Sequence, residues 1–286
     1  MTPLGLTELV KRLDQADYLV DDGLAMALFL TQSVGQPLLL EGEPGVGKTA
    51  AAIALAKALD TDFIRLQCYE GISASEALYE WNYPHQLLSI RSAEGNRLDS
   101  QDLFTERFLL DRPLLRAIRH SGPRPPVLLI DEVDRSDDEF EALLFEFLGE
   151  ASVTIPELGT FTAQTRPVVI LTSNRSRELH DALKRRCYYH WIDYPSVERA
   201  AAIVRRNVPQ GATELVTAAT NFIARTRSLD LDKPPGLAEA VDWVAALHAL
   251  GVSDLERTSA TATLGAIAKS PDDLDTIHAE LAQATL

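Results

Sequence analysis

The sequence is poor in cysteine and lacks long hydrophobic runs, and each shortage excludes a class of protein. Its 286 residues include two cysteines, Cys68 and Cys187, which form neither a disulfide framework nor a zinc knuckle. A reduced, cytoplasmic compartment is therefore expected. The longest apolar runs, such as residues 127–130, fall far short of a membrane span, and the N-terminal residues lack the pattern of a signal peptide.

Basic residues are also scarce. The chain has 27 Lys and Arg against 42 Asp and Glu, which gives a formal net charge of −15. Such a surplus repels phosphate, so sequence-independent binding to nucleic acid is not expected. The remaining composition, 46% hydrophobic and 24% charged, is typical of a folded protein. The length of 286 residues allows one large domain or two unequal ones.

Short apolar runs alternate with helical patterns from about Gln36 to Pro195. The runs at residues 37–40, 63–66, 127–130 and 168–171 have the near-continuous apolar character of buried parallel strands. This alternation predicts an α/β fold with helices on both faces of a parallel sheet. Further along, Ser136–Glu139 resembles a capping box before a helix, and residues 153–162 resemble a small β-hairpin.

The pattern becomes helical after Ser196. Apolar residues then recur at helical spacing, as in the stretches 197–204, 215–223 and 237–244. We therefore predict an α/β domain over residues 1–195 and a small helical domain over residues 196–286.

The segment Gly42–Thr49 matches the P-loop pattern G-x-x-x-x-G-K-[ST], between an apolar strand and a helix. Its glycines let successive backbone N–H groups point at phosphates, with Lys48 on the β- and γ-phosphates and the Thr49 hydroxyl on Mg²⁺. The alternative is a Gly-Pro turn before a helix. The residues predicted to contact the nucleotide here are Glu43, Pro44, Gly45, Val46, Gly47, Lys48, Thr49 and Ala50.

Two further strands end in polar residues suited to phosphate chemistry. Asp131 and Glu132 follow residues 127–130; Asp131 suits a hold on Mg²⁺ and Glu132 the polarisation of an attacking water. Asn174 follows residues 168–171 and can bond both a γ-phosphate oxygen and that water. The alternatives are a simple strand exit for the carboxylates and a turn-capping role for Asn174.

A cluster of cations, Lys184-Arg185-Arg186, follows a short predicted helix. An arginine fork suits a γ-phosphate, whereas the alternative is that the cluster complements the helix C-terminus. Residues 15–250 resemble an AAA+ ATPase through this ordered set of motifs. The segments 38–49, 68–71 and 153–156 resemble the MoxR family more narrowly, and residues 79–83 resemble its CoxD-like subgroup.

This resemblance implies a P-loop NTPase domain with a helical lid that hydrolyses Mg²⁺-bound ATP between the protomers of a hexameric ring. Arg186, or else Arg185, corresponds to the arginine finger of that family, and Leu19 and Val20 to the adenine-packing position. A client protein and a von Willebrand A-domain adaptor are the implied partners, in chaperone-like maturation of metalloenzymes.

One departure from the family concerns its second sensor arginine. The corresponding stretch, residues 234–239, contains no arginine, so Arg225 or Arg227 is the candidate substitute. A nucleotide-gated assembly module with little hydrolysis is therefore the alternative function. A DNA motor is disfavoured because the hairpin carries Glu157 and no basic residue.

Three aromatic residues follow the second predicted strand. Tyr79, Trp81 and Tyr83 could grip a client or dock an adaptor. Packing into the core is the favoured interpretation for Trp81, and Tyr83 stays open.

Overall fold

The computed structural model describes residues 4–92 and 100–284. Backbone contacts divide the chain into two compact units. The first comprises residues 1–41 and 49–191, and the second comprises residues 42–48 and 192–286. The P-loop thus groups with the C-terminal segment, while the predicted domain boundary at residue 195 stays a prediction.

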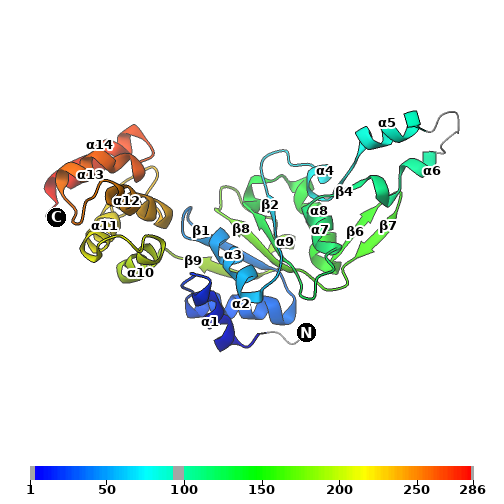
Figure 1. The fold of residues 1–286 in the computed structure, drawn as a ribbon, viewed down its shortest axis with the longest axis horizontal. Helices are drawn as coiled ribbons and strands as arrows, with labels where there is room; N and C mark the ends of the chain where they lie inside the picture. The colour runs from blue at the N-terminus through cyan, green and yellow to red at the C-terminus, as the bar shows by residue number, and fades with distance from the viewer. Residues whose placement is uncertain (1–3, 93–99, 285–286) are drawn as a thin grey trace. The chain divides into compact units, whose positions relative to one another are not determined.

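A five-stranded sheet with the order β2-β5-β8-β1-β9 forms the centre of the first unit (Figure 1). The pairs β1–β8, β2–β5 and β5–β8 are parallel, which confirms the predicted α/β fold. The strands are β1 (Leu38–Gly42), β2 (Phe63–Gln67), β5 (Val127–Asp131), β8 (Val168–Ser173) and β9 (Tyr188–Ile192). Every residue of β1, β5 and β8 is buried, as their apolar runs require.

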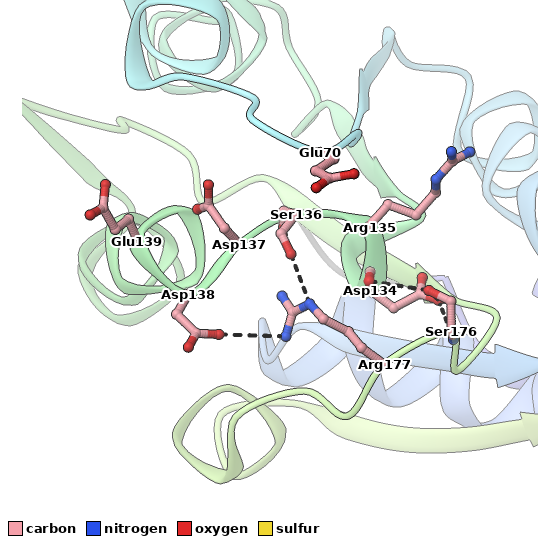
Figure 2. A pocket seen from close by; sticks show the side chains of 9 residues that line it. All are labelled: Glu70, Asp134, Arg135, Ser136, Asp137, Asp138, Glu139, Ser176 and Arg177. Atoms are coloured by element: carbon pink, nitrogen blue, oxygen red, sulfur yellow. Dashed lines mark hydrogen bonds and ion pairs between the residues drawn. The ribbon is translucent and has the colours of Figure 1, made fainter.

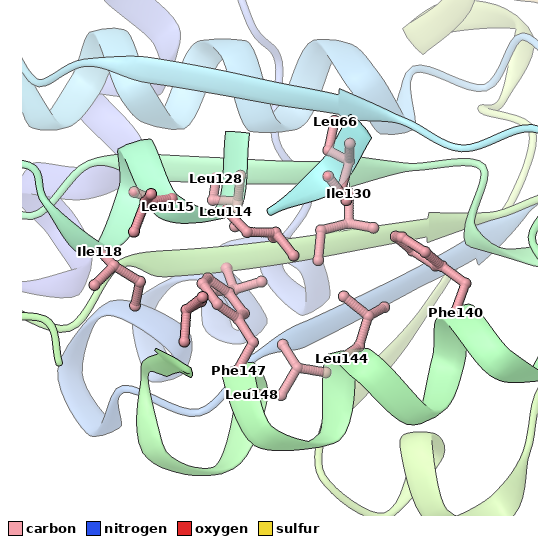
Figure 3. Packing of buried hydrophobic residues seen from close by; sticks show 14 of the residues in the cluster. Leu66, Leu114, Leu115, Ile118, Leu128, Ile130, Phe140, Leu144, Phe147 and Leu148 are labelled. Atoms are coloured by element: carbon pink, nitrogen blue, oxygen red, sulfur yellow. The ribbon is translucent and has the colours of Figure 1, made fainter. Parts of the chain in front are cut away.

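Alternate side chains of the strands form the core on one face of this sheet (Figure 3). Leu66, Leu128 and Ile130 meet apolar residues of α7 and α8. The helical elements described for this part of the chain are α1 (Leu6–Gln15), α2 (Asp22–Val34), α3 (Lys48–Leu59), α4 (Ala74–Ala77), α5 (Tyr83–Ser92), α6 (Ser100–Leu103), η1 (Glu106–Phe108), α7 (Pro113–Ile118), η2 (Val133–Arg135), α8 (Asp138–Glu150) and α9 (Asp181–Lys184).

The predicted start of α8 was wrong by one residue. The helix is capped by Asp137, whose carboxylate accepts the backbone N–H of Phe140 at 2.9 Å. Ser136 instead donates to the carbonyl of Val133 at 2.7 Å and closes η2. An aspartate next to a serine offers a second cap acceptor, and the tight turn of η2 decides between them.

Two antiparallel strand pairs complete the first unit. β6 (Ser152–Ile155) and β7 (Gly159–Thr162) form the predicted hairpin, and β3 (Tyr79–Trp81) pairs with β4 (Leu109–Asp111). Trp81 is 7% exposed and lies edge-to-face on Phe104 with ring centroids 5.2 Å apart, so it packs in the core as expected. Tyr83 is 57% exposed.

The C-terminal part of the chain is helical, as predicted. Its elements are α10 (Val197–Asn207), α11 (Thr213–Thr226), α12 (Leu237–Ala249), α13 (Arg257–Thr263), η3 (Leu264–Ala266) and α14 (Pro271–Gln283). Trp243 is fully buried at its centre, where the indole N–H donates to Thr263 at 2.8 Å. Within residues 4–92 and 100–284, no helix is long and apolar enough to cross a bilayer.

Candidate functional site

The P-loop has the backbone that its glycines predict. Gly45 and Gly47 have φ angles of +77° and +97°, a region that residues with a Cβ rarely adopt. Helix α3 begins at Lys48, so its first N–H groups lie at the end of this loop. The Lys48 ammonium donates to the carbonyls of Gly42 and Glu43 at 2.7 and 2.8 Å. The loop therefore brings a buried cation and a helix N-terminus together, the combination that binds phosphate.

The residue after Lys48 faces the end of β5. The Thr49 hydroxyl lies 3.2 and 3.3 Å from the two carboxylate oxygens of Asp131, which is 2% exposed. Hydroxyl and carboxylate oxygens are the hard ligands that Mg²⁺ prefers, and Mg²⁺ is bound in proteins by few such groups together with water and substrate phosphates. The donor set at Thr49 and Asp131 therefore fits this ion.

Two further residues contact the same carboxylate. Thr172 of β8 donates to Asp131 Oδ1 at 2.5 Å, and Arg65 of β2 donates to Oδ2 at 2.5 Å. Because β2, β5 and β8 are adjacent parallel strands, their C-terminal ends meet at one edge of the sheet. The sequence predicted Thr49 and Asp131 as site residues but not the neighbouring Thr172 and Arg65, since only the strand order brings these two to Asp131.

Glu132 has an unusual backbone. Its φ is +54° and its ψ +49°, in the left-handed region that costs a non-glycine residue free energy. Its N–H donates to Thr172 at 2.9 Å, and its carboxylate lies 3.1 Å from Arg135. Thr172 thus connects to both acidic residues at the end of β5, because one hydroxyl donates to Asp131 and accepts from Glu132.

The loop that carries Asn174 is tied to the segment after β5. The buried Asp134 carboxylate accepts the N–H groups of Asn174 and Ser176 at 3.2 and 2.8 Å, and the Ser176 hydroxyl at 2.7 Å. Figure 2 shows Asp134 beside Ser176 among the side chains that line a pocket. Asp134 was not predicted as a site residue; its neighbour in space is 40 residues away in the chain.

That pocket has a cavity volume of about 760 Å³ and an acidic lining (Figure 2). Arg177 donates to the carbonyl of Ser136 at 2.7 Å and lies 2.5 Å from the buried carboxylate of Glu141. The lining residues are Glu70, Asp134, Arg135, Ser136, Asp137, Asp138, Glu139, Ser176 and Arg177. The lining thus carries five carboxylates and two guanidinium groups, in keeping with the net charge of the chain.

The predicted finger residues are exposed at the end of α9. Arg186 donates to the carbonyl of Ala182 at 3.0 Å, and its guanidinium lies 5.0 Å from the ring centroid of Phe145. This contact matches the helix C-terminus alternative, and an exposed arginine also suits a finger that reaches a neighbouring subunit. Leu19 and Val20 are half-buried just before α2.

The two candidate substitutes for the second sensor differ in their contacts. Arg227 forms an ion pair with Glu43 of the P-loop and donates to the carbonyl of Pro235 at 2.9 Å. Arg225 is paired with Glu280 at 2.5 Å. Of the two, Arg227 is the one that contacts the phosphate loop.

Cys68 follows β2 and bonds through its backbone to Asp131, at the end of β5. Its N–H donates to the carbonyl of Asp131 at 2.8 Å, and the residue is 1% exposed. Burial, followed by the negative charges of Asp131, Asp134 and Glu132, raises the pKa of the Cys68 thiol to about 12. Burial likewise raises the pKa of Cys187 to about 12. Thiols in such settings are unreactive, so neither is a candidate nucleophile.

Comparison with known protein families identifies the family of the segment that carries the P-loop and the end of β5. Residues 38–192 match the ATPase family associated with various cellular activities (AAA), and the chain belongs to that family. This membership confirms the predicted class of enzyme, an ATPase.

Two curated proteins are similar in sequence. The gas vesicle ATPase GvpN of Haloferax mediterranei is 26% identical over 240 residues, which cover 80% of this chain and 66% of that protein. The Lon protease of Halothermothrix orenii is 32% identical over 117 residues, 41% of this chain and 12% of that protein. The chain thus spans less than two thirds of the length of either relative.

Two solved structures share the fold. A point mutant of RuvB from Thermotoga maritima has a TM-score of 0.51 at 20% identity, covering 95% of this chain and 72% of that one. A candidate ATPase of Cytophaga hutchinsonii has a TM-score of 0.50 at 17% identity, covering 96% and 85%. At these identities the likeness concerns the fold alone.

Proposed function

We propose that this chain binds Mg²⁺–ATP at its P-loop and uses hydrolysis to remodel a partner protein. The observation that carries the proposal is the contact between Thr49 and the buried Asp131, directly after Lys48 at the start of α3. Lys48 and the loop residues 43–47 and Ala50 bind the phosphates. Thr49 and Asp131 hold the ion, which supplies charge neutralisation on the phosphate oxygens.

Glu132 and Asn174 are the proposed hydrolytic residues. Once the Glu132 carboxylate has separated from Arg135, it takes a proton from the attacking water. The side-chain amide of Asn174 orients that water. Asp134 fixes the backbone of the Asn174 loop through the N–H groups of Asn174 and Ser176. Arg227 senses nucleotide by exchanging Glu43 for a phosphate oxygen, in the role of the missing second sensor.

A ring assembly follows from the same proposal. Arg186, or Arg185, acts as a finger on the nucleotide of a neighbouring subunit, and Leu19 and Val20 pack against adenine. The resemblance to the MoxR family and to the gas vesicle ATPase supports a chaperone-like role in the assembly of a protein complex. A hexamer, a von Willebrand A-domain adaptor and metalloenzyme maturation as in the CoxD-like subgroup are the specific form of this proposal.

The test is steady-state ATP hydrolysis by wild type, Lys48→Ala and Glu132→Gln, with Mg²⁺ and over a range of protein concentrations. Lys48→Ala should abolish nucleotide binding and hydrolysis, whereas Glu132→Gln should bind ATP and hydrolyse it at least about 100-fold more slowly. Turnover per subunit should rise with concentration, because a finger from a neighbour requires assembly. Near-wild-type turnover in Lys48→Ala would refute the proposal.

One observation favours the alternative of an assembly module with little hydrolysis. Glu132 has a strained backbone, and its carboxylate pairs with Arg135, a contact that competes with a role as general base. Capture experiments with ATP-loaded Glu132→Gln separate the two functions. A remodeller shows hydrolysis stimulated by the captured partner, whereas an assembly module binds the partner without stimulation.

A further inference from the structure

The carboxylate of Asp131 has a positively charged partner of its own. Arg65 Nη2 lies 2.5 Å from Asp131 Oδ2, and Arg65 also donates to the side-chain oxygen of Gln67 at 2.5 Å. The register of β2 on β5 places Gln67 beside Asp131 and Arg65 beside Leu129. The guanidinium thus extends along β2 and bridges its own strand to the end of β5.

This contact differs from the other contacts of Asp131. Thr49 and Thr172 offer neutral hydroxyls, while Arg65 supplies a full positive charge to a carboxylate whose side chain is 3% exposed. A buried carboxylate is costly without a counter-charge, so Arg65 stabilises Asp131 in the ligand-free chain. The same negative charge is what a magnesium ion at Thr49 and Asp131 requires.

Arg65 can leave this position without being buried elsewhere. Its side chain is 48% exposed, so a guanidinium displaced from Asp131 returns to water while Gln67 remains within reach. A guanidinium that remains beside Asp131 repels a divalent ion at the same carboxylate, whereas one that moves into water leaves the carboxylate to the ion.

We propose that Arg65 acts as an internal cation that competes with Mg²⁺ for Asp131 and so sets the magnesium concentration at which nucleotide is retained. This inference rests on the proposed function, because it assumes that Thr49 and Asp131 hold the ion. In the ligand-free chain Arg65 neutralises Asp131, and arrival of Mg²⁺ with nucleotide replaces one cation by another. More magnesium is then needed to retain the nucleotide than Thr49 and Asp131 alone would require.

The experiment is a Mg²⁺ titration of the full chain at saturating non-hydrolysable ATP analogue (AMP-PNP), read as melting temperature. Arg65→Gln should lower the half-saturating Mg²⁺ about tenfold, because the competing charge is gone. It should also lower the melting temperature without ligand, because Asp131 then lacks its counter-charge. Arg65→Lys keeps the positive charge, so its half-saturating Mg²⁺ should stay closer to the wild-type value than that of Arg65→Gln.

Arg112→Gln is the matched control. The Arg112 side chain is 43% exposed and pairs with Glu80 of β3, outside the five-stranded sheet. This variant should leave the half-saturating Mg²⁺ unchanged. A half-saturating Mg²⁺ in Arg65→Gln that equals or exceeds the wild-type value overturns the inference, and it would identify Arg65 as a structural or positioning group for Asp131.

The remaining outcomes of the titration separate the role of Arg65 from the proposed function. If Arg65→Gln does not fold, Arg65→Met decides, because it also removes the charge; a half-saturating Mg²⁺ at or above the wild-type value in that variant overturns the inference. If wild type shows no Mg²⁺-dependent stabilisation by AMP-PNP, the proposed function fails, and the inference fails with it. Normal magnesium dependence in wild type with no shift in the Arg65 variants refutes the role of Arg65 alone.

Discussion

The substitution Thr172→Val should destabilise the α/β unit more than the same substitution does at a buried threonine that bonds no charged group. The Thr172 side chain is 1% exposed, donates to Asp131 at 2.5 Å and accepts from the Glu132 N–H at 2.9 Å. Valine has nearly the same shape and suits a strand, so the change removes two hydrogen bonds and little packing. A bond to a buried charge is worth about 1.5–3 kcal/mol and a neutral one about 1 kcal/mol. The expected loss is therefore about 2.5–4 kcal/mol.

Urea unfolding followed by circular dichroism and by tryptophan fluorescence measures this loss. With a slope near 2 kcal/mol per M, the midpoint should fall by roughly 1–2 M for the transition of the α/β unit. The matched control is Thr31→Val: Thr31 is also 1% exposed, but its hydroxyl donates only to the helix carbonyl of Ala27 at 2.9 Å. That carbonyl keeps its helical partner, so the control should lose less than about 1 kcal/mol.

The comparison of the two variants decides the reasoning. Equal midpoint shifts for Thr172→Val and Thr31→Val would mean that the link between β8 and the two acidic residues contributes no stability of its own. A larger shift with an unchanged slope assigns the difference to that link. A changed slope would instead point to altered compactness of the unfolded chain.

Two other predictions follow from the contacts described above. Arg227→Ala should raise the KM for ATP or lower kcat by about tenfold or more, because it removes the guanidinium that contacts Glu43 of the P-loop. Arg225→Ala, the control, should leave both constants within about twofold. Similar effects of the two changes would exclude Arg227 as a sensor. Burial raises the pKa of Cys68 to about 12, so native protein at pH 8 should resist alkylation at this residue, while protein in guanidinium reacts. The protonated thiol is favoured in the folded state, so its contribution to stability is complete below about pH 9 and is lost as pH rises toward 12, detectable as a falling urea midpoint. Rapid labelling of native Cys68 would contradict this burial argument.

The sequence predicted best what depends on neighbouring residues in the chain. Four of the five strands were identified because each carries a short apolar run; β1, β5 and β8 are buried throughout, and β2 alternates buried with exposed residues. β9 was missed, since its residues 188–192 are aromatic and polar and only partly buried. The β3–β4 pairing was missed for a related reason: the two strands are three residues each and lie far apart in the chain.

The same division applies to the candidate site. Each site residue predicted from the sequence, such as Lys48, Asp131 or Asn174, belongs to a local motif, a glycine-rich loop or a strand end. The contacts of Arg65, Thr172 and Asp134 were not foreseen, because they depend on which strands are adjacent and in which register. No local signal distinguishes Arg65 from any other exposed arginine of a strand.

The sequence by itself determined the α/β class, the helical C-terminal part and the residues suited to phosphate and magnesium chemistry, because local composition and spacing decide those features. Only the tertiary structure decided that one carboxylate, Asp131, is shared by groups from β2, α3 and β8. It also decided that Arg227 rather than Arg225 contacts the P-loop. The physical reason is the same in each case: a charge interaction depends on distances of a few ångströms, and residues far apart in sequence reach those distances only through strand order and helix packing.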